Sequence, residues 1–324
     1  MTKKLLTVNI VTYNHQKYIA KCLDSILEQK TNFDFVVRIF DDCSNDGTSE
    51  ICKDYQKKFP DKIEYHAPSE HIGYKNGILI NCVKAYENIQ TPYYMYIEGD
   101  DYRLDVDGFQ KQIDALEEHP ECAFCMGNTI NYRNNKFSDI HPNIPSGIYD
   151  REFMKKYPER YIFSNLAARI VRTSCIKMDY ANPSVYLFDI TQFYELMKQG
   201  GMYFINEVFA CYNVTGNGIS TSTNLFGKIV RNAQIFNDYN VYSNKIFEQN
   251  LAIYYIQDIY GYYLWELEKL AELRKDSNEH KQKQNIIKKL KHYFLPQAII
   301  DLFNLPRNIS RQIRSAFRKD KSLL

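Results

Sequence analysis

Residues 35–48 read FVVRIFDDCSNDGT, an apolar run that gives way to carboxylates, a glycine and a threonine that can cap a helix. Residues 5–14 read LLTVNIVTYN, a second short apolar run that ends in polar side chains. Short apolar runs bounded by turn residues predict buried strands. The two stretches therefore predict two core strands, each followed by a polar loop.

Helix and strand patterns alternate over the first hundred residues. Apolar residues recur every three or four positions from Ile19 to Leu27, which predicts a helix between the two strands. We expect a helix capped by Thr48, a strand over 62–66, a helix over 78–89 and a strand over 93–97. This alternation predicts an α/β fold with a doubly wound, mostly parallel sheet, in which ligands bind beyond the carboxyl ends of the strands.

The pattern divides the chain into three regions. Residues 1–220 hold the α/β pattern, with a helix over 105–119 and short strands and loops over 120–220. Residues 221–279 are aromatic-rich and read as a C-terminal helical region, and 280–324 form a basic amphipathic tail. We therefore expect one α/β domain with a C-terminal helical extension.

Composition excludes several classes of protein. The chain has 324 residues, 44% of them hydrophobic and 25% charged, which excludes a disordered, collagen-like or coiled-coil protein. The net charge of +2 hides an asymmetry, because the last 45 residues carry eleven Lys and Arg against Asp301 and Asp320. The total charge gives no nucleic-acid signature.

The eight cysteines follow no disulfide framework, and the C-x-x-C pair Cys122 and Cys125 has no second pair to complete a zinc site. We expect ordinary buried thiols. The sequence shows neither a signal peptide nor the run of about 18 apolar residues that a spanning helix needs. We therefore expect a cytoplasmic protein.

Three polar clusters follow the predicted strands: residues 12–14 (Thr-Tyr-Asn), residues 41–48 and residues 98–101 (Glu-Gly-Asp-Asp). The carboxyl ends of parallel strands share one edge of the sheet, so these clusters should converge. Paired carboxylates suit Mg²⁺ or Mn²⁺ together with substrate phosphates. A tyrosine can stack on a base, and an aspartate can accept a hydrogen bond from an imide. The expected ligand is a nucleoside diphosphate with a divalent metal.

Each cluster also has a structural interpretation. Residues 46–48 are typical of a turn and helix start, and Asp100 with Asp101 also fits a solvated loop. No Walker loop and no G-x-G-x-x-G motif is present. We expect structural or surface roles for the scattered histidines His15, His66, His71, His119 and His141.

Taken together, T-Y-N, then D-D-x-S-x-D-G-T, then x-G-D-D-Y resembles the pattern of the family 2 glycosyltransferases over about residues 5–220. The resemblance implies a GT-A fold and inverting transfer from a nucleotide sugar. It implies that Tyr13 stacks on the base and that Asp42 binds the base, usually uracil. Asp100 and Asp101 take the place of the metal-binding D-x-D motif, Asp101 as the direct ligand, and Glu98 replaces the first Asp.

The residues that this resemblance assigns to nucleotide-sugar binding are Thr12, Tyr13, Asn14, Asp42, Lys75, Glu98 and Asp100. It also places Asp189, ahead of a helix and Gly200, on the general base that accepts the proton of an acceptor hydroxyl. The structural alternative is that Asp189 only caps that helix. The segment Tyr212–Ser220 lacks the Arg and His that relatives often carry near the diphosphate.

The tail over 280–324 alternates apolar and basic residues at helical spacing. Such a segment can lie on the inner leaflet of a membrane, or it can pack on the catalytic domain with its charges solvated. Nucleic acid is a poorer partner, because no base-stacking module accompanies the charge.

The combined interpretation is a glycosyltransferase that uses Mn²⁺ or Mg²⁺ and a nucleotide-sugar donor, with a saccharide or lipid-linked glycan as acceptor in surface polysaccharide synthesis. The resemblance implies a UDP-sugar as the donor. Two alternatives stay open. One is a non-catalytic scaffold that binds a membrane or a partner through its tail. The other is a nucleotidyltransferase, which should carry a basic, glycine-rich phosphate loop that residues 8–14 lack.

Overall fold

The computed structural model describes residues 3–75, 78–157, 162–177, 189–215, 239 and 242–246. The chain divides into one unit of residues 1–156 and 161–224 and another of residues 157–160 and 225–324. The fold below is that of the first unit. Apart from 239 and 242–246, the expected helical region 221–279 and the basic tail 280–324 lie outside the described residues.

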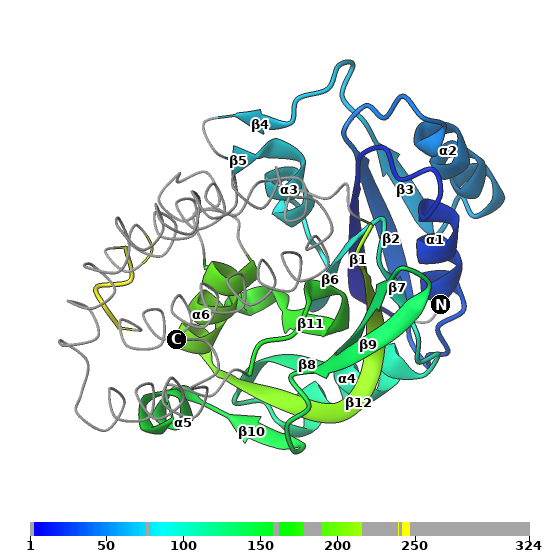
Figure 1. Cartoon of the computed structure of the whole chain (residues 1–324). Helices are drawn as coiled ribbons and strands as arrows, with labels where there is room; N and C mark the ends of the chain where they lie inside the picture. Colours follow the sequence, from blue (N-terminus) through cyan, green and yellow to red (C-terminus); the bar gives the residue numbers. More distant parts are fainter. Residues whose placement is uncertain are drawn as a thin grey trace, which may run out of the picture. The chain divides into compact units, whose positions relative to one another are not determined.

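Four parallel strands form the N-terminal half of the sheet, in the order β6-β1-β2-β3 (Figure 1). They are β1 (Lys4–Thr12), β2 (Asp34–Asp41), β3 (Ile63–His66) and β6 (Tyr93–Glu98). The helices between them are α1 (Ile19–Leu27), α2 (Thr48–Lys58) and α3 (Ile80–Tyr86). The strand and helix predictions for this half are confirmed, except that the predicted helix over 78–89 begins with two strand residues.

The other half of the sheet is mixed, so the expectation of a mostly parallel sheet is wrong. Strand β11 (Arg169–Arg172) runs antiparallel to both of its neighbours, β6 and β8 (Cys122–Arg133). Strand β12 (Gly201–Asn213) runs parallel to β8. β8 and β12 have 12 and 13 residues, so the short strands expected over 120–220 are also wrong for this pair.

Three smaller strands pair with the two long strands β8 and β12. Besides β11, the antiparallel partners of the two long strands are β7 (Tyr102–Arg103), β9 (Lys136–His141) and β10 (Gly147–Tyr149). A separate hairpin joins β4 (Tyr74–Lys75) to β5 (Ile78–Leu79). The remaining helices are α4 (Gly108–Glu118), α5 (Arg151–Lys156), α6 (Asp189–Gln199) and two 3₁₀ turns, Leu166–Ala168 and Thr173–Cys175.

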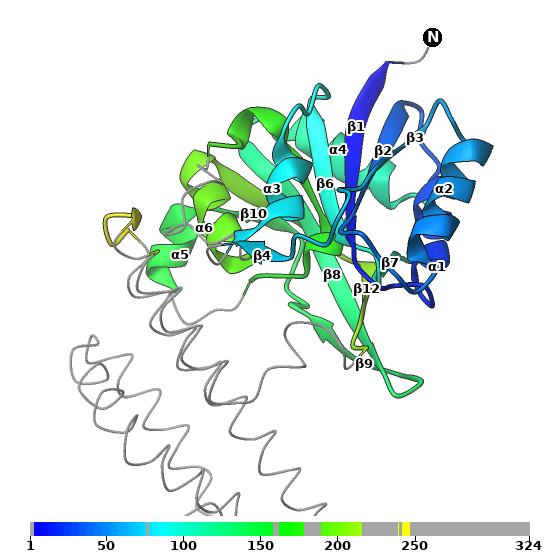
Figure 2. The same ribbon diagram turned by 90° about the horizontal axis from the view of Figure 1, so that it is seen from above.

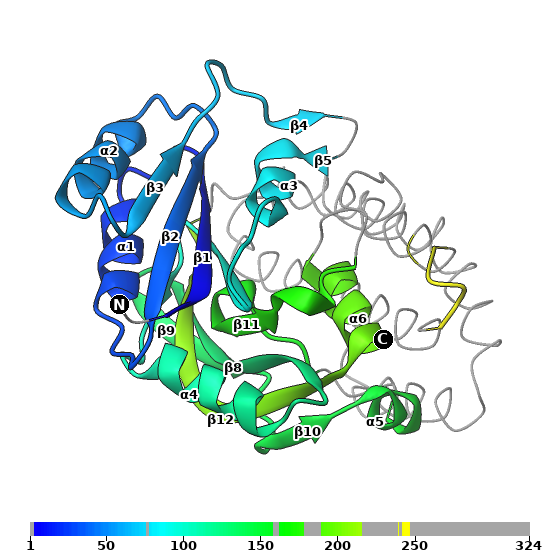
Figure 3. The same ribbon diagram turned by 180° about the vertical axis from the view of Figure 1, so that it is seen from behind.

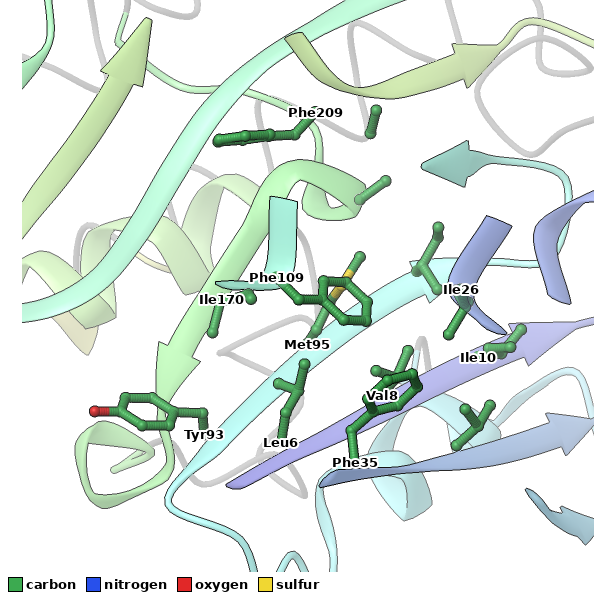
Figure 4. Close-up of a cluster of buried hydrophobic side chains, with 14 of the residues drawn as sticks. Leu6, Val8, Ile10, Ile26, Phe35, Tyr93, Met95, Phe109, Ile170 and Phe209 are labelled. Atoms are coloured by element: carbon green, nitrogen blue, oxygen red, sulfur yellow. The ribbon is translucent and has the colours of Figure 1, made fainter. Parts of the chain in front are cut away.

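Helices cover both faces of the sheet, which is what a doubly wound fold requires. On one face, Leu6, Val8 and Met95 pack with Ile26 of α1 and Phe109 of α4 in the main core (Figure 4). Each such fully buried apolar side chain stabilises the fold by roughly 1.5–3 kcal/mol. Seen from behind, α1 and α2 lie beside β1, β2 and β3 (Figure 3).

The opposite face of β6 presents alternate residues, because side chains alternate along a strand. Tyr94 packs edge-on against Tyr86 of α3, and the Tyr96 hydroxyl lies 2.9 Å from the Cys82 sulfur. Gln192 of α6 donates to the Tyr86 hydroxyl at 2.6 Å. Helices α3 and α6 therefore lie on the side of β6 away from α1 (Figure 2).

The prediction of free thiols is confirmed: all eight cysteines are free, and Cys122 and Cys125 are buried in β8. Among the described residues, no helix combines the length and the apolar character that crossing a membrane requires.

Candidate active site at the carboxyl ends of three strands

The three polar clusters converge at one edge of the sheet, as the sequence predicts. In the parallel register Thr12 of β1 lies opposite Asp41 of β2, and Val11 lies opposite Glu98 of β6. The chain continues this pairing past the strand ends, since the Asp42 amide donates to the Thr12 carbonyl at 3.0 Å and the Gly99 amide donates to the Val11 carbonyl at 2.9 Å. The loops after β1, β2 and β6 therefore start side by side.

Asp41 and Asp46 build the loop after β2. The fully buried Asp41 carboxylate accepts from the Ser44 amide at 3.1 Å, from the Tyr65 hydroxyl at 2.8 Å and from the Ser49 hydroxyl. Asp46 accepts from the Thr48 amide at 3.1 Å and from its hydroxyl at 2.6 Å. The turn interpretation of residues 46–48 is therefore confirmed.

The start of α2 differs in detail from the prediction. Gly47, with a φ of 98°, occupies the N-cap position, and Thr48 is the first helical residue rather than the cap. The Asp46 side chain supplies the acceptor for the Thr48 amide, the first of the helix, which is the role of a capping carboxylate. Glycine fits at position 47 because only glycine adopts this left-handed conformation without strain.

Asn14 joins the first loop to the second. Its amide donates to the Ser44 hydroxyl at 2.9 Å, and its side-chain oxygen accepts from the Asn45 amide at 3.0 Å. Its φ of 56° turns the chain away from β1. Next to it, Tyr13 is 37% exposed.

Asp42 is held by the segment of residues 71–73. Its carboxylate accepts from the Ile72 amide at 3.1 Å and from the Gly73 amide at 2.8 Å, and the His71 Nδ1 atom lies 3.0 Å from Oδ2. The His71 ring stacks on Tyr13, with 4.1 Å between centroids and 21° between planes. The structure thus brings Tyr13 and Asp42 together and adds His71, which sequence reasoning assigned to a structural or surface role.

Asp100 and Asp101 are buried beyond β6, at 8% and 1% exposure, so the alternative of a solvated loop pair is wrong. Asp101 Oδ1 accepts from the Asn213 amide at 2.8 Å. Asp100 Oδ1 and Asp101 Oδ2 have no hydrogen-bond partner within the described part of the chain. Desolvation, then the charges of Asp100 and Glu98, raises the pKa of Asp101. Desolvation also raises the pKa of Asp100, against the opposing charge of His15.

Glu98 lies at the open end of this cluster. Its side chain reaches solvent, yet protein surrounds it closely enough that desolvation raises its pKa to about 8, with further contributions from the charges of Asp100 and Asp189. Glu98 is thus electrostatically coupled to its neighbours and accessible to a ligand.

Asp189 is the first residue of α6 and is partly buried. Its charge raises the pKa of Glu98 and of Tyr212, which places it within electrostatic range of the strand-end carboxylates. Residues 178–188, which precede it, lie outside the described residues. The predicted base and the predicted metal-binding pair therefore belong to one cluster.

Tyr212 near the end of β12 was not predicted. Desolvation raises the pKa of its phenol, and the charges of Glu98, Asp101, Asp189 and Asp100 raise the pKa further. The phenol therefore stays protonated and can donate a hydrogen bond within the cluster. No local pattern identifies it, since it is one of 27 tyrosines.

Two remaining predicted residues have different surroundings. Thr12 is buried, and its hydroxyl has no hydrogen-bond partner among the described residues. The backbone of Lys75 pairs with that of Ile78 in the antiparallel β4–β5 pair.

The carboxylate cluster supplies part of the ligand set that a hard divalent cation needs. The described residues contain no group of three or more His, Cys, Asp or Glu side chains that could hold a metal ion by themselves. Asp100 and Asp101 nevertheless offer two buried carboxylate oxygens that accept no hydrogen bond from the residues the structure describes. Mg²⁺ and similar ions commonly bind through one or two carboxylates and complete their shell with substrate phosphates and water. The residues present fit such a shared site.

Comparison with known proteins agrees with this geometry. Residues 7–178, more than half of the chain, match the family model described as glycosyl transferase family 2. An uncharacterized Mycobacterium tuberculosis protein is 30% identical over 37% of this chain and 34% of its own length. The Bacillus subtilis protein TuaG, named for a role as a teichuronic acid biosynthesis glycosyltransferase, is 26% identical over 68% of this chain and 83% of its own length. The chain thus spans about a third of the length of the first of these relatives.

Solved structures share the fold. The structure of S. aureus TarS residues 1–349 in complex with UDP-GlcNAc superposes with a TM-score of 0.56 and 15% identity, covering 78% of this chain and 72% of that one. The mannosyltransferase PcManGT from Pyrobaculum calidifontis, in complex with GDP-Man and Mn²⁺, gives a TM-score of 0.51 and 13% identity over 90% and 81% of the two chains. At these identities the likeness is one of fold, and it supports the predicted GT-A class.

Proposed function

Because the chain belongs to glycosyl transferase family 2, we propose that it transfers a sugar, with inversion, from a nucleotide-sugar donor to a saccharide or lipid-linked glycan acceptor. A UDP-sugar is the proposed donor. One observation carries the proposal. The carboxyl ends of the strands bring together Asp42, the candidate for nucleobase binding, and the carboxylate pair Asp100 and Asp101. Asp189, the candidate general base, lies within electrostatic range of this cluster.

The donor is proposed to bind across the ends of β1, β2 and β6. Tyr13, which is 37% exposed, is proposed to stack on the base, and Asp42, which is 4% exposed and contacts His71, is proposed to accept from the N–H edge of the base. The same site has Thr12, Asn14, Glu98 and Lys75 as further proposed nucleotide-sugar contacts. Of these, Asn14 has a structural function already, since it holds Ser44 and Asn45 in place.

A divalent cation, Mn²⁺ or Mg²⁺, is proposed to be held by Asp101 and Asp100. When bound, it would neutralise the charge on the leaving diphosphate. Within the described part of the chain, His15 approaches this buried pair, with its Nε2 atom 3.9 Å from Asp100 Oδ2. Desolvation by burial raises the pKa of both carboxyl groups, and the charges of Asp100 and Glu98 raise the pKa of Asp101 further.

Asp189 is proposed to act as the general base. Its carboxylate would accept the proton of the acceptor hydroxyl while that oxygen attacks the anomeric carbon and the C–O bond to the diphosphate breaks. A single displacement of this kind inverts the anomeric centre. The charged form of Asp189 suits the start of α6, because a helix N-terminus stabilises a carboxylate.

The biological setting is proposed from the relatives. TuaG is named for teichuronic acid biosynthesis, and a 26% identical relative from Escherichia coli is a chondroitin synthase. Both names point to polysaccharide synthesis, so we place this protein in surface polysaccharide assembly. A cytoplasmic location, with the basic tail over 280–324 on the inner leaflet, belongs to the same proposal.

A nucleotide panel tests the proposed function. We would measure thermal unfolding of the full chain with UDP, GDP, CDP and TDP, each with and without Mn²⁺ or Mg²⁺. A ligand at a hundred times its dissociation constant stabilises a protein by about 2.7 kcal/mol. We expect UDP to stabilise the protein and EDTA to reduce the shift. If no nucleotide stabilises the protein, the transferase proposal is wrong and a non-catalytic scaffold becomes the better interpretation.

A further inference from the structure

Tyr13 and Asp42, the two residues proposed to bind the nucleobase, already contact a side chain of the same protein. His71 stacks on Tyr13 at 4.1 Å between ring centroids. Its Nδ1 atom lies 3.0 Å from Asp42 Oδ2 and 3.0 Å from the Asp42 carbonyl oxygen. Because both neighbours are hydrogen-bond acceptors, Nδ1 is the nitrogen that carries the proton. His71 therefore presents to Tyr13 and Asp42 a flat ring and an N–H donor.

These are the two features with which a nucleobase would bind the same pair. A base offers a flat face for stacking and, in uracil, an imide N–H for a carboxylate. The space between Tyr13 and His71 does not admit a base, because a ring stacked on both sides needs about 7 Å, twice a carbon–carbon contact of roughly 3.5 Å. A base that stacks on the face of Tyr13 covered by His71 must therefore take the place of His71.

The segment of residues 71–73 places the His71 ring on Tyr13, and the exposure of the His71 side chain allows it to move away. The His71 side chain is 47% exposed, so no core packing holds it. Gly73 has a φ of +55°, and a Cβ at this position would lie 3.0 Å from His71 Nε2. Glycine therefore lets the chain turn back so that the imidazole reaches Tyr13.

We propose that His71 is a third determinant of nucleotide binding, which occupies the base position in the free protein and competes with the nucleobase for Tyr13 and Asp42. This inference rests on the proposed function, since it takes Tyr13 and Asp42 as the base site. Apparent affinity falls by the fraction of molecules in which the site is open. A closed arrangement that outweighs the open one by about tenfold weakens nucleotide binding by about tenfold.

Substitution of His71 tests the competition. Titration calorimetry with UDP and Mn²⁺ compares the wild type with His71→Ala, which removes the ring, and His71→Phe, which keeps a stacking ring and removes the N–H. We expect His71→Ala to bind UDP about three- to tenfold more tightly and His71→Phe to fall between the two. His66→Ala is the matched control, because His66 also stacks on an aromatic ring, Phe40 at 5.0 Å, and is 45% exposed.

A second measurement, which does not depend on comparing affinities, follows the His71 ring itself. In NMR spectra of the histidine-labelled protein, the His71 signal, identified by its loss in His71→Ala, should show the ring-current shift of a stacked imidazole. UDP should abolish that shift. Unchanged or weaker UDP binding by His71→Ala overturns the competition while the wild type still binds UDP. If no folded variant binds any nucleoside diphosphate, the proposed function fails, and the competition fails with it.

Discussion

Thr12 leaves no room for a side chain on Gly99: a Cβ built there would lie 2.6 Å from Thr12 Oγ1 and 2.9 Å from Thr12 Cβ. Thr12 is 1% exposed and ends β1, so its side chain has little freedom to move. This close approach lets the chain after β6 pass directly over the end of β1. It thereby sets the start of the turn that places Asp100 and Asp101 in the site.

We therefore expect Gly99→Ala to destabilise the protein by about 1–3 kcal/mol, the usual cost of forcing extra atoms into a packed region. Urea unfolding measures the loss. Gly201→Ala is the control, since its Cβ would meet neighbours at 3.3 to 3.7 Å. Equal stability of Gly99→Ala and wild type would show that Thr12 can move aside, contrary to the packing described above.

The N-terminal half of this fold is predictable because its signals are local. Strand β1 is buried from Leu6 to Thr12 and its sequence is mostly apolar, and α1 shows one buried face. The other half is not, because strand direction depends on partners far away in the chain. Val171 of β11 pairs with Tyr94 of β6, 77 positions earlier, and neither local sequence records whether the pairing is parallel or antiparallel.

The site divides in the same way. The clusters at the strand ends are visible in the sequence, but the different contacts of Asp41 and Asp42 are not. Alternation along a strand sends neighbouring side chains in opposite directions, so Asp41 turns to Ser44 and Tyr65 while Asp42 meets residues 71–73. His71 is 29 positions from Asp42, and its contact arises only when the chain folds back.

Glu98 should make the stability of the metal-free protein depend on pH. Its pKa is raised from 4.5 to about 8, so its stabilising contribution is full below pH 4.5 and is lost as the pH rises through 8. We expect Glu98→Gln to match the wild type near pH 5 and to exceed it at pH 9 by about 1 kcal/mol, a value reduced for solvent screening of this exposed side chain. Thermal unfolding in EDTA at several pH values measures the difference.

Glu50→Gln provides the control for this series, because Glu50 is exposed in the first turn of α2, away from the carboxylate cluster. Its offset from the wild type should stay constant between pH 6 and 9. If the offset of Glu98→Gln is constant as well, Glu98 is not electrostatically coupled to its neighbours.

Asp101→Asn should have two effects of opposite sign. At pH 7 and without metal the variant should be at least as stable as the wild type, since burial and the neighbouring carboxylates disfavour the charge of Asp101. The amide oxygen can still accept from the Asn213 amide. In the presence of UDP, the additional stabilisation by Mn²⁺ should disappear. Thermal unfolding with UDP, with and without Mn²⁺, measures both effects.

Asp105→Asn is the matched control for Asp101→Asn. Asp105 accepts from Lys111 at 2.7 Å, away from the carboxylate pair, so the variant should lose about 0.5–1 kcal/mol of stability and keep the response to Mn²⁺. If Asp101→Asn retains the full Mn²⁺ response, Asp101 is not the metal ligand.

Asp189 can be tested as a base separately from its position at the start of α6. Asp189→Ser keeps a residue that suits a helix start, whereas Asp189→Asn keeps the shape of the side chain, and neither can accept a proton at neutral pH. If Asp189 is the general base, both variants should bind UDP as the wild type does and lose about 10²–10⁴-fold in turnover. Release of UDP from the donor sugar measures turnover, and calorimetry measures binding. Wild-type turnover in Asp189→Ser would assign Asp189 to helix capping alone, and the base would then have to be sought among the other carboxylates of the cluster, beginning with Glu98, whose pKa of about 8 suits proton transfer near neutral pH.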